Sequence, residues 1–119
     1  MIIRHFLTWI GNARVSERVA AASALSRAFL NHELPFDERC EAEAALTLLL
    51  DDPSPKVRAA LSEALSMSRQ APPQIVAALA SDQEDVAQWV LVRSPVLSDA
   101  DLIDRVAAAT GRMQALIAS

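Results

Sequence analysis

Few residues of this chain have the types and spacing that catalysis or metal binding requires. The two histidines, His5 and His32, stand in different predicted helices. Neither belongs to an H-x-x-x-H or H-E-x-x-H pattern, which would place zinc ligands on one helix face. The single cysteine, Cys40, has no histidine nearby, so we expect a buried or half-buried small residue rather than a nucleophile. The sequence therefore predicts no catalytic residue, no cofactor and no metal site.

The acidic residues and the glycines indicate helix ends rather than ligand sites. Asp99, Asp101 and Asp104 fall where a helix begins, and negative charge there is favourable for the helix dipole. A calcium loop would need denser oxygen ligands and a glycine. Gly11 and Gly111 stand alone, so we expect no phosphate-binding loop.

The run of residues 51–61, DDPSPKVRAAL, has the spacing of a turn between two helices of a repeat. Asp52 falls in the turn, Pro55 takes the first position of the second helix, and Arg58 follows one turn later. From this position Arg58 can reach back across the turn. We therefore predict that Asp52 and Arg58 form a structural clamp across the turn.

Residues 80–90 are a weaker echo of the same run. Val57 aligns with Val86, and the same step along the chain relates Leu50 to Leu79 and Leu46 to Ile75. A fixed step of roughly 20–50 residues signals stacked helical units. In the echo, Ser81 replaces the turn aspartate and Ala87 replaces the arginine, so we expect the second unit to lack the clamp.

Two large side chains stand where the first unit has alanines, because the alignment places Trp89 at Ala60 and Arg93 at Ala64. One interpretation is that Trp89 fills a wider gap against the terminal helices, since tryptophan is usually mostly buried. The other is that Trp89 and Arg93 form a stacked pair on a groove surface, and both residue types are enriched at binding hot spots. We take Trp89 and Arg93 as the candidate binding residues.

Apolar residues at helical spacing predict eight short helices,. They begin near residues 2, 13 or 16, 37, 55, 73, 83, 99 and 112, and the predicted caps are Asp37, Ser54, Asp82 and Ser98,. Short connections make consecutive helices antiparallel neighbours, which bury their apolar faces by stacking. We expect an all-α fold, a right-handed stack of antiparallel helix pairs, rather than a globular bundle.

The composition agrees with one such domain over residues 1–119, with N-terminal helices in 1–50 and repeat units in 51–119. The chain is 52% hydrophobic and 4% aromatic, and it has only 2 glycines, which disfavours a sheet. Its formal net charge is −4. This charge makes nucleic acid and anionic membranes poor partners, and we expect neither.

The ends of the stack are apolar. The stretch Ile2–Ile10 is too short to span a bilayer, and no signal peptide is expected. We interpret it as the buried face of a first helix, with an interfacial membrane helix or a dimer contact as alternatives. We predict a homodimer through a terminal helix pair, or a docking face for further chain. The single cysteine suits a reducing cytoplasm, where we expect the protein.

The core should be continuous between units, because one helix pair alone is too small to be stable. The predicted core residues are Leu61, Leu65, Ile75, Leu79, Val86, Val90, Leu102 and Val106.

Asp52, Val57 and Arg58, in this order and spacing, are similar to the HEAT-repeat pattern. That resemblance implies that the turn aspartate bonds the turn backbone and pairs with the arginine of the following helix. The step from Val57 to Val86 is short for HEAT units, which have about 40 residues or more. The chain from Asp52 onward also resembles a bacterial family, the domain of unknown function 2336, most distinctively in residues 90–99, VLVRSPVLSD. This family implies a helical-repeat fold without an established activity, and its longer members suggest a short relative or an N-terminal part.

The predicted function is a non-catalytic scaffold for protein–protein interaction or a regulatory adaptor, since a solenoid is mainly a surface for partners. The alternative is a nucleic-acid-binding helical repeat similar to HEAT-like DNA glycosylases, which would require a basic concave stripe. The arginines are instead spread over nearly every predicted helix. The partner's identity does not follow from the sequence.

Overall fold

The computed structural model describes residues 2–31 and 34–108, with only the backbone of residues 2–4, 7 and 104–108. The helices are α1 (Ile2–Ile10), α2 (Val15–Leu30), α3 (Phe36–Leu49), α4 (Pro55–Leu65), α5 (Pro73–Ala80), α6 (Glu84–Arg93) and α7 (Asp99–Ala108). These described residues contain no strand, which confirms the all-α class. The eighth predicted helix lies outside them. No helix in the described part of the chain has both the length and the apolar character needed to cross a membrane.

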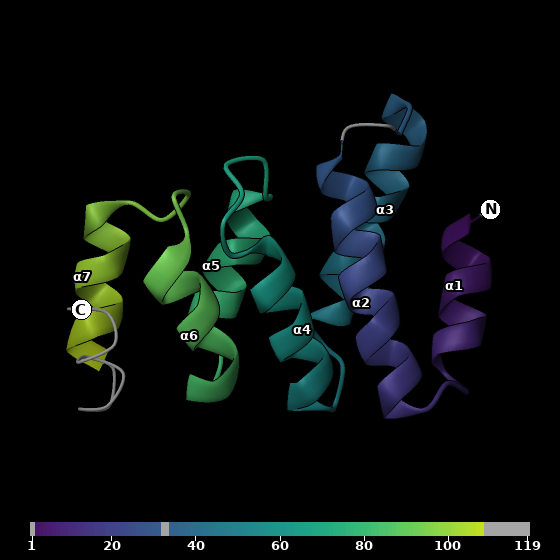
Figure 1. Ribbon diagram of the computed structural model, residues 1–119, viewed down its shortest axis with the longest axis horizontal. Coiled ribbons are helices and arrows are strands. Elements are labelled where there is room, and N and C mark those ends of the chain that lie inside the picture. Colours follow the sequence, from purple (N-terminus) through teal and green to yellow (C-terminus); the bar gives the residue numbers. More distant parts are fainter. Residues whose placement is uncertain (1, 32–33, 109–119) are drawn as a thin grey trace.

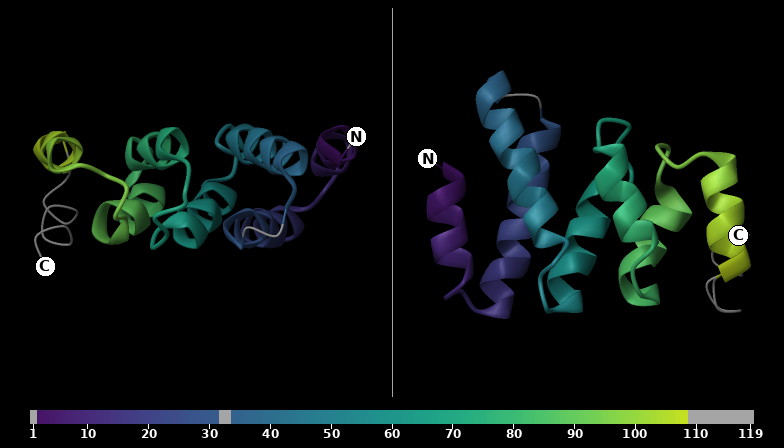
Figure 2. Two further views of the ribbon diagram at one scale, coloured as in Figure 1. Left: turned by 90° about the horizontal axis from the view of Figure 1, so that it is seen from above. Right: turned by 180° about the vertical axis from the view of Figure 1, so that it is seen from behind.

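The helices form two layers, and consecutive helices alternate between them. Helices α2, α4 and α6 form the front layer, and α1, α3, α5 and α7 form the back layer (Figures 1 and 2). Within the front layer, α2 packs against α4 and α4 packs against α6. The extents of 43 × 29 × 17 Å describe an elongated slab. The C-terminal ends of the three front helices consequently lie along one edge of this slab (Figure 1).

Two of the predicted helix caps are confirmed. Ser54 caps α4, where its hydroxyl accepts a hydrogen bond from the Lys56 amide at 3.3 Å, and Pro55 opens the helix. Ser98 and Asp101 form a reciprocal capping box at the start of α7. The Ser98 hydroxyl accepts from the Asp101 amide at 3.1 Å, and the Asp101 carboxylate accepts from the Ser98 amide at 3.1 Å,.

The predicted caps of α3 and α6 are wrong by one or two residues. Helix α3 begins directly after Pro35, whose φ of −57° and ψ of 158° suit the cap position, so Asp37 lies inside the first turn. Helix α6 has Gln83 at its cap. Asp82 lies one residue earlier, where its carboxylate accepts from the Gln83 amide at 2.7 Å. It therefore organises the turn before the helix rather than capping it.

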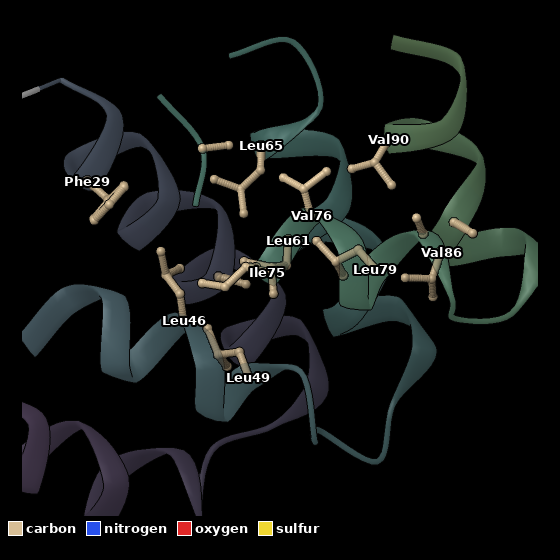
Figure 3. Packing of buried hydrophobic residues seen from close by; sticks show 14 of the residues in the cluster. Phe29, Leu46, Leu49, Leu61, Leu65, Ile75, Val76, Leu79, Val86 and Val90 are labelled. Carbon is tan, nitrogen blue, oxygen red and sulfur yellow. The ribbon is translucent and has the colours of Figure 1, made fainter. Parts of the chain in front are cut away.

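One hydrophobic core runs through the stack, as predicted (Figure 3). Leu61, Leu65, Ile75, Leu79, Val86 and Val90 are all fully buried in the same cluster. Leu102 is half-buried against this cluster, and Val106 lies outside the described side chains. Phe29 of α2 and Leu46 of α3 belong to the same cluster, so the core joins both layers. The two layers are thus held together by one shared core.

Equivalent turns can be recognised by a shared main-chain hydrogen bond after each back helix. The amides of Asn12, Asp52 and Asp82 donate to Trp9, Leu49 and Leu79 at 3.0, 3.1 and 3.1 Å. Asn12, Asp52 and Asp82 therefore hold the same place in three successive turns.

The two intervals between these turns differ in length, because the chain from Asp52 to Asp82 is shorter than the chain from Asn12 to Asp52. The helix caps that follow the turns are Arg14, Ser54 and Gln83. Gln83 follows Asp82 directly, whereas Pro53 stands between Asp52 and Ser54. The turn before α6 is thus one residue shorter, and Asp82 rather than Ser81 corresponds to Asp52.

Candidate functional site

Arg18 of α2 joins its own turn to the next turn of the stack. Its Nε and Nη2 donate to the Asp52 carboxylate at 2.9 and 3.2 Å, and its Nη1 donates to the Ala13 carbonyl at 2.8 Å. Asp52 also accepts from the Ser54 amide at 2.9 Å. The two charged side chains are only 15% and 6% exposed. This bidentate geometry is the strong form of an arginine–carboxylate pair.

Arg58 of α4 repeats this arrangement one unit later. Its Nε and Nη2 donate to the Asp82 carboxylate at 2.8 and 3.3 Å, and its Nη1 donates to the Asp52 carbonyl at 2.6 Å. Arg18 and Arg58 are each the fourth residue of a front helix. We call Arg18, Asp52, Arg58 and Asp82 together the turn ladder.

The turn ladder corrects the predicted clamp. Arg58 does reach back across the turn, but it bonds the main-chain oxygen of Asp52. The Asp52 carboxylate is instead bound by Arg18, which lies 34 residues earlier in the chain. The second unit also retains its turn aspartate as Asp82, and lacks only the arginine, because Ala87 is the fourth residue of α6. Within the described residues, the ladder therefore consists of two ion pairs.

A surface groove lies over the C-terminal ends of the front helices. Its volume is about 610 Å³, and it is lined by Arg27 and Leu30 of α2, by Ala60, Glu63 and Ala64 of α4, by the segment 66–68 and by Arg93 of α6. A neighbouring depression is lined by Met67, Arg69, Arg93 and Pro95. We call the two together the front-layer groove. Residues of α2, α4 and α6, and of the connections that follow α4 and α6, all line this groove. The groove therefore depends on the packing of the three front helices.

Trp89 and Arg93 are stacked, as one of the two predicted interpretations requires. The Arg93 Cζ lies 4.7 Å from the centre of the Trp89 ring. Trp89 is half-buried, whereas Arg93 is exposed and lines the groove. The terminal helix that Trp89 was expected to touch lies outside the described residues. The structure thus places Arg93 at the groove with Trp89 behind it, and a binding role for the pair stays a prediction.

The arginines around the groove differ from those of the turn ladder. Arg27, Arg69 and Arg93 form no ion pair with any carboxylate in the described part of the chain. Among the described residues that line the groove, Glu63 is the one acidic residue. Arg27 and Arg93 lie in the last turns of α2 and α6, where positive charge is favourable for the helix dipole. Sequence reasoning missed Arg27 and Arg69, because only the fold brings them near Arg93.

The structure does not bring the histidines and the cysteine together into a catalytic or metal site among the described residues. Cys40 is exposed, so the expectation that it is buried or half-buried is wrong. It lies on the solvent side of α3, whereas Ala42 and Ala45 supply the buried side. His5 is exposed, and His32 lies outside the described residues. Among the residues that the structure describes, no group of three or more histidine, cysteine or acidic residues could hold a metal ion.

The N-terminal end of the stack exposes an aromatic residue. Trp9 takes the position of Leu49 and Leu79 in the turn alignment. Those leucines are 2% and 0% exposed, whereas Trp9 is 43% exposed. The ring centroids of Phe6 and Trp9 are 6.3 Å apart, and Phe6 is half-buried. Helix α1 lies at the end of its layer (Figure 1), where it packs against α3.

No protein-family model matches the chain, and the comparisons with curated proteins and with solved structures found no match. What can be said of function therefore depends on the geometry of this molecule. That geometry defines an all-α protein of two helical layers, with a turn ladder at one edge and the front-layer groove at the opposite edge.

Proposed function

We propose that this protein is a non-catalytic scaffold for protein–protein interaction or a regulatory adaptor, built from HEAT-like repeats as a right-handed superhelix. The first step between equivalent turns, from Asn12 to Asp52, has the length of a HEAT unit, roughly 40 residues. Helices α4 and α5 together account for the shorter second step, because they have 11 and 8 residues against 16 in α2 and 14 in α3. The proposal includes membership of the bacterial family that the sequence resembles, and a cytoplasmic location.

The observation that carries the proposal is the front-layer groove, in which Arg93, stacked on Trp89, lines both depressions. By the turn alignment, α2 and α4 have alanines at these two positions of the front helix. Stacking on Trp89 restricts Arg93, so a partner would lose less conformational entropy on binding it. Met67 is 74% exposed beside it, and methionine adapts to varied partner surfaces. An arginine, an aromatic residue and a methionine are typical of interface cores.

The alternative function, nucleic-acid binding, is favoured by one observation. Arg27, Arg69 and Arg93 have no carboxylate partner in the described residues, and arginine binds phosphate in the same bidentate way as carboxylate. Against it stand the net charge of −4 and the presence of Glu63 at the groove. Nucleic-acid binding is usually dominated by an extensive positive surface, so we prefer a protein partner.

Site-specific photo-cross-linking in the cells that make the protein tests the proposal. A cross-linking amino acid at Met67 should capture a protein of defined mass. The same amino acid at Thr47, which is exposed on α3 of the back layer, should not. Arg93→Gln should weaken the capture at Met67. Equal labelling from both positions, or cross-links to nucleic acid alone, would contradict the proposal.

A further inference from the structure

We propose that the front-layer groove binds an acidic segment of a partner protein that also carries an apolar side chain. Carboxylates of this segment would pair with Arg27, Arg69 and Arg93, and the apolar side chain would pack on Met67. This inference rests on the proposed function and names the chemistry of its partner.

The charge distribution supports an acidic ligand. Arg18 and Arg58 are paired with aspartates in the turn ladder, whereas Arg27, Arg69 and Arg93 have no such pair among the described residues. An acidic chain with a net charge of −4 therefore gathers unpaired guanidinium groups at one groove. Guanidinium is planar and presents paired donors that match a carboxylate.

The opposing charges limit the strength of this attraction. Glu63 contributes one negative charge at the groove, and each front helix ends there with roughly half an elementary negative charge. The positive charge of the three guanidinium groups exceeds the negative charge of Glu63 and the helix ends only slightly. We therefore expect a modest affinity that falls as the salt concentration rises. The apolar contact contributes the part of the binding free energy that does not depend on salt.

The apolar part of the groove favours a peptide over a nucleic acid. Leu30, Ala60 and Ala64 line it together with the exposed Met67, which offers an aliphatic side chain a place to pack. Single-stranded nucleic acids are usually held by bases stacked on aromatic rings. The aromatic side chain that contacts Arg93 is Trp89, and the Arg93 guanidinium already covers one face of its ring.

Fluorescence anisotropy tests the inference with a short labelled peptide of glutamate, aspartate and leucine. The comparison probes are the same peptide with glutamine and asparagine, one with lysine, and a short DNA duplex. The variant Arg27→Gln/Arg93→Gln removes two groove charges. Its matched control, Arg14→Gln/Lys56→Gln, removes two exposed positive charges at the opposite ends of α2 and α4. Both double variants therefore change the net charge equally.

The acidic peptide should bind the unaltered protein more tightly than the other probes do. The groove variant should weaken this binding about fivefold or more, and the control variant less than about twofold. Arg69→Gln, which lies in the connection after α4, should weaken it without disturbing a helix. This single change keeps the test decisive if the double groove variant fails to fold.

Three results would overturn the inference. They are equal weakening by both double variants, equal binding of the acidic and amide peptides, and groove-dependent binding of the DNA duplex in place of the acidic peptide. If the peptide fails while Met67 still cross-links one protein specifically, the partner's chemistry is wrong but the scaffold function stands. If both fail, the proposed function fails as well.

Discussion

Arg18 and Asp52 are joined by two hydrogen bonds, at 2.9 and 3.2 Å, although 34 residues separate them in the chain. The pair connects the first helix of the front layer to the turn that precedes the second. Arg58 and Asp82 make the same connection one unit later. The spacing between neighbouring turns is therefore held by polar contacts at the edge of the slab as well as by the core.

The ladder predicts which residues are energetically coupled. Arg18→Ala and Asp52→Ala should show a coupling free energy of about 1–2 kcal/mol in a double-mutant cycle, because the pair is bidentate and mostly buried. Asp52→Ala alone should cost about 2–3 kcal/mol, more than Arg18→Ala, because it also removes the acceptor of the Ser54 amide,. Urea unfolding followed by circular dichroism measures both quantities.

A second cycle distinguishes the ladder from a clamp within one turn. Arg58 and Asp82 should be coupled to a similar extent, because their side chains pair directly. Arg58 and Asp52 should show less than about 0.5 kcal/mol of coupling, because Arg58 contacts only the main-chain oxygen of Asp52, which alanine retains,. Strong coupling between Arg58 and Asp52 with none to Asp82 would contradict the observed geometry.

The continuous core predicts a single thermal transition. Leu79→Ala should lower the free energy of unfolding by about 2–5 kcal/mol, since Leu79 is fully buried between the layers,. Leu48→Ala makes the same chemical change on an exposed position of α3, and it should cost less than about 1 kcal/mol. Calorimetry that resolved two independent transitions in the Leu79 variant would show that the halves do not share a core.

The capping box at α7 predicts a smaller, local effect. Ser98→Ala should destabilise the protein by about 1 kcal/mol, because the Asp101 amide loses its acceptor,. Ser81→Ala is the matched control, since its hydroxyl makes one exposed hydrogen bond, to the Ala77 carbonyl, and it should change stability by less than about 0.5 kcal/mol. Amide hydrogen exchange at the start of α7 should rise in the Ser98 variant alone.

Self-association through a terminal helix pair stays a prediction, and Trp9 offers a way to test it. If α1 forms the contact, the mass from light scattering should rise with concentration, and Trp9→Gln should return the protein to a monomer. Removing a 43% exposed side chain should leave the fold intact. A monomer at all accessible concentrations would refute the homodimer.

The sequence was sufficient for most of the core and for the caps of α4 and α7. Apolar spacing identified Leu61, Ile75 and Val86 without any tertiary information, and Ser98 with Asp101 satisfied a capping box that depends on four consecutive residues. These features involve one helix at a time. Their physical causes can therefore be read from short segments.

The turn ladder could not be predicted in the same way, because it depends on contacts between units. One signal was available, since Asn12 precedes Arg18 by the same interval that separates Asp52 from Arg58. The turn before α6 is one residue shorter than the turn before α4, so an alignment without gaps paired Asp52 with Ser81. This pairing hid the equivalence of Asp82 to Asp52. The groove arginines were also inaccessible, because Arg27 and Arg93 come together only when the front helices pack side by side.

The unequal back helices have a consequence for how the chain tolerates changes in length. Helix α3 has 14 residues and α5 has 8, yet the turns that follow them carry equivalent aspartates bound by equivalent arginines. The ladder thus fixes the edge where the front helices begin, and the differences in helix length fall at the opposite edge. A change of length in the connection between a front helix and the next back helix should therefore leave the register of the front-helix starts unchanged.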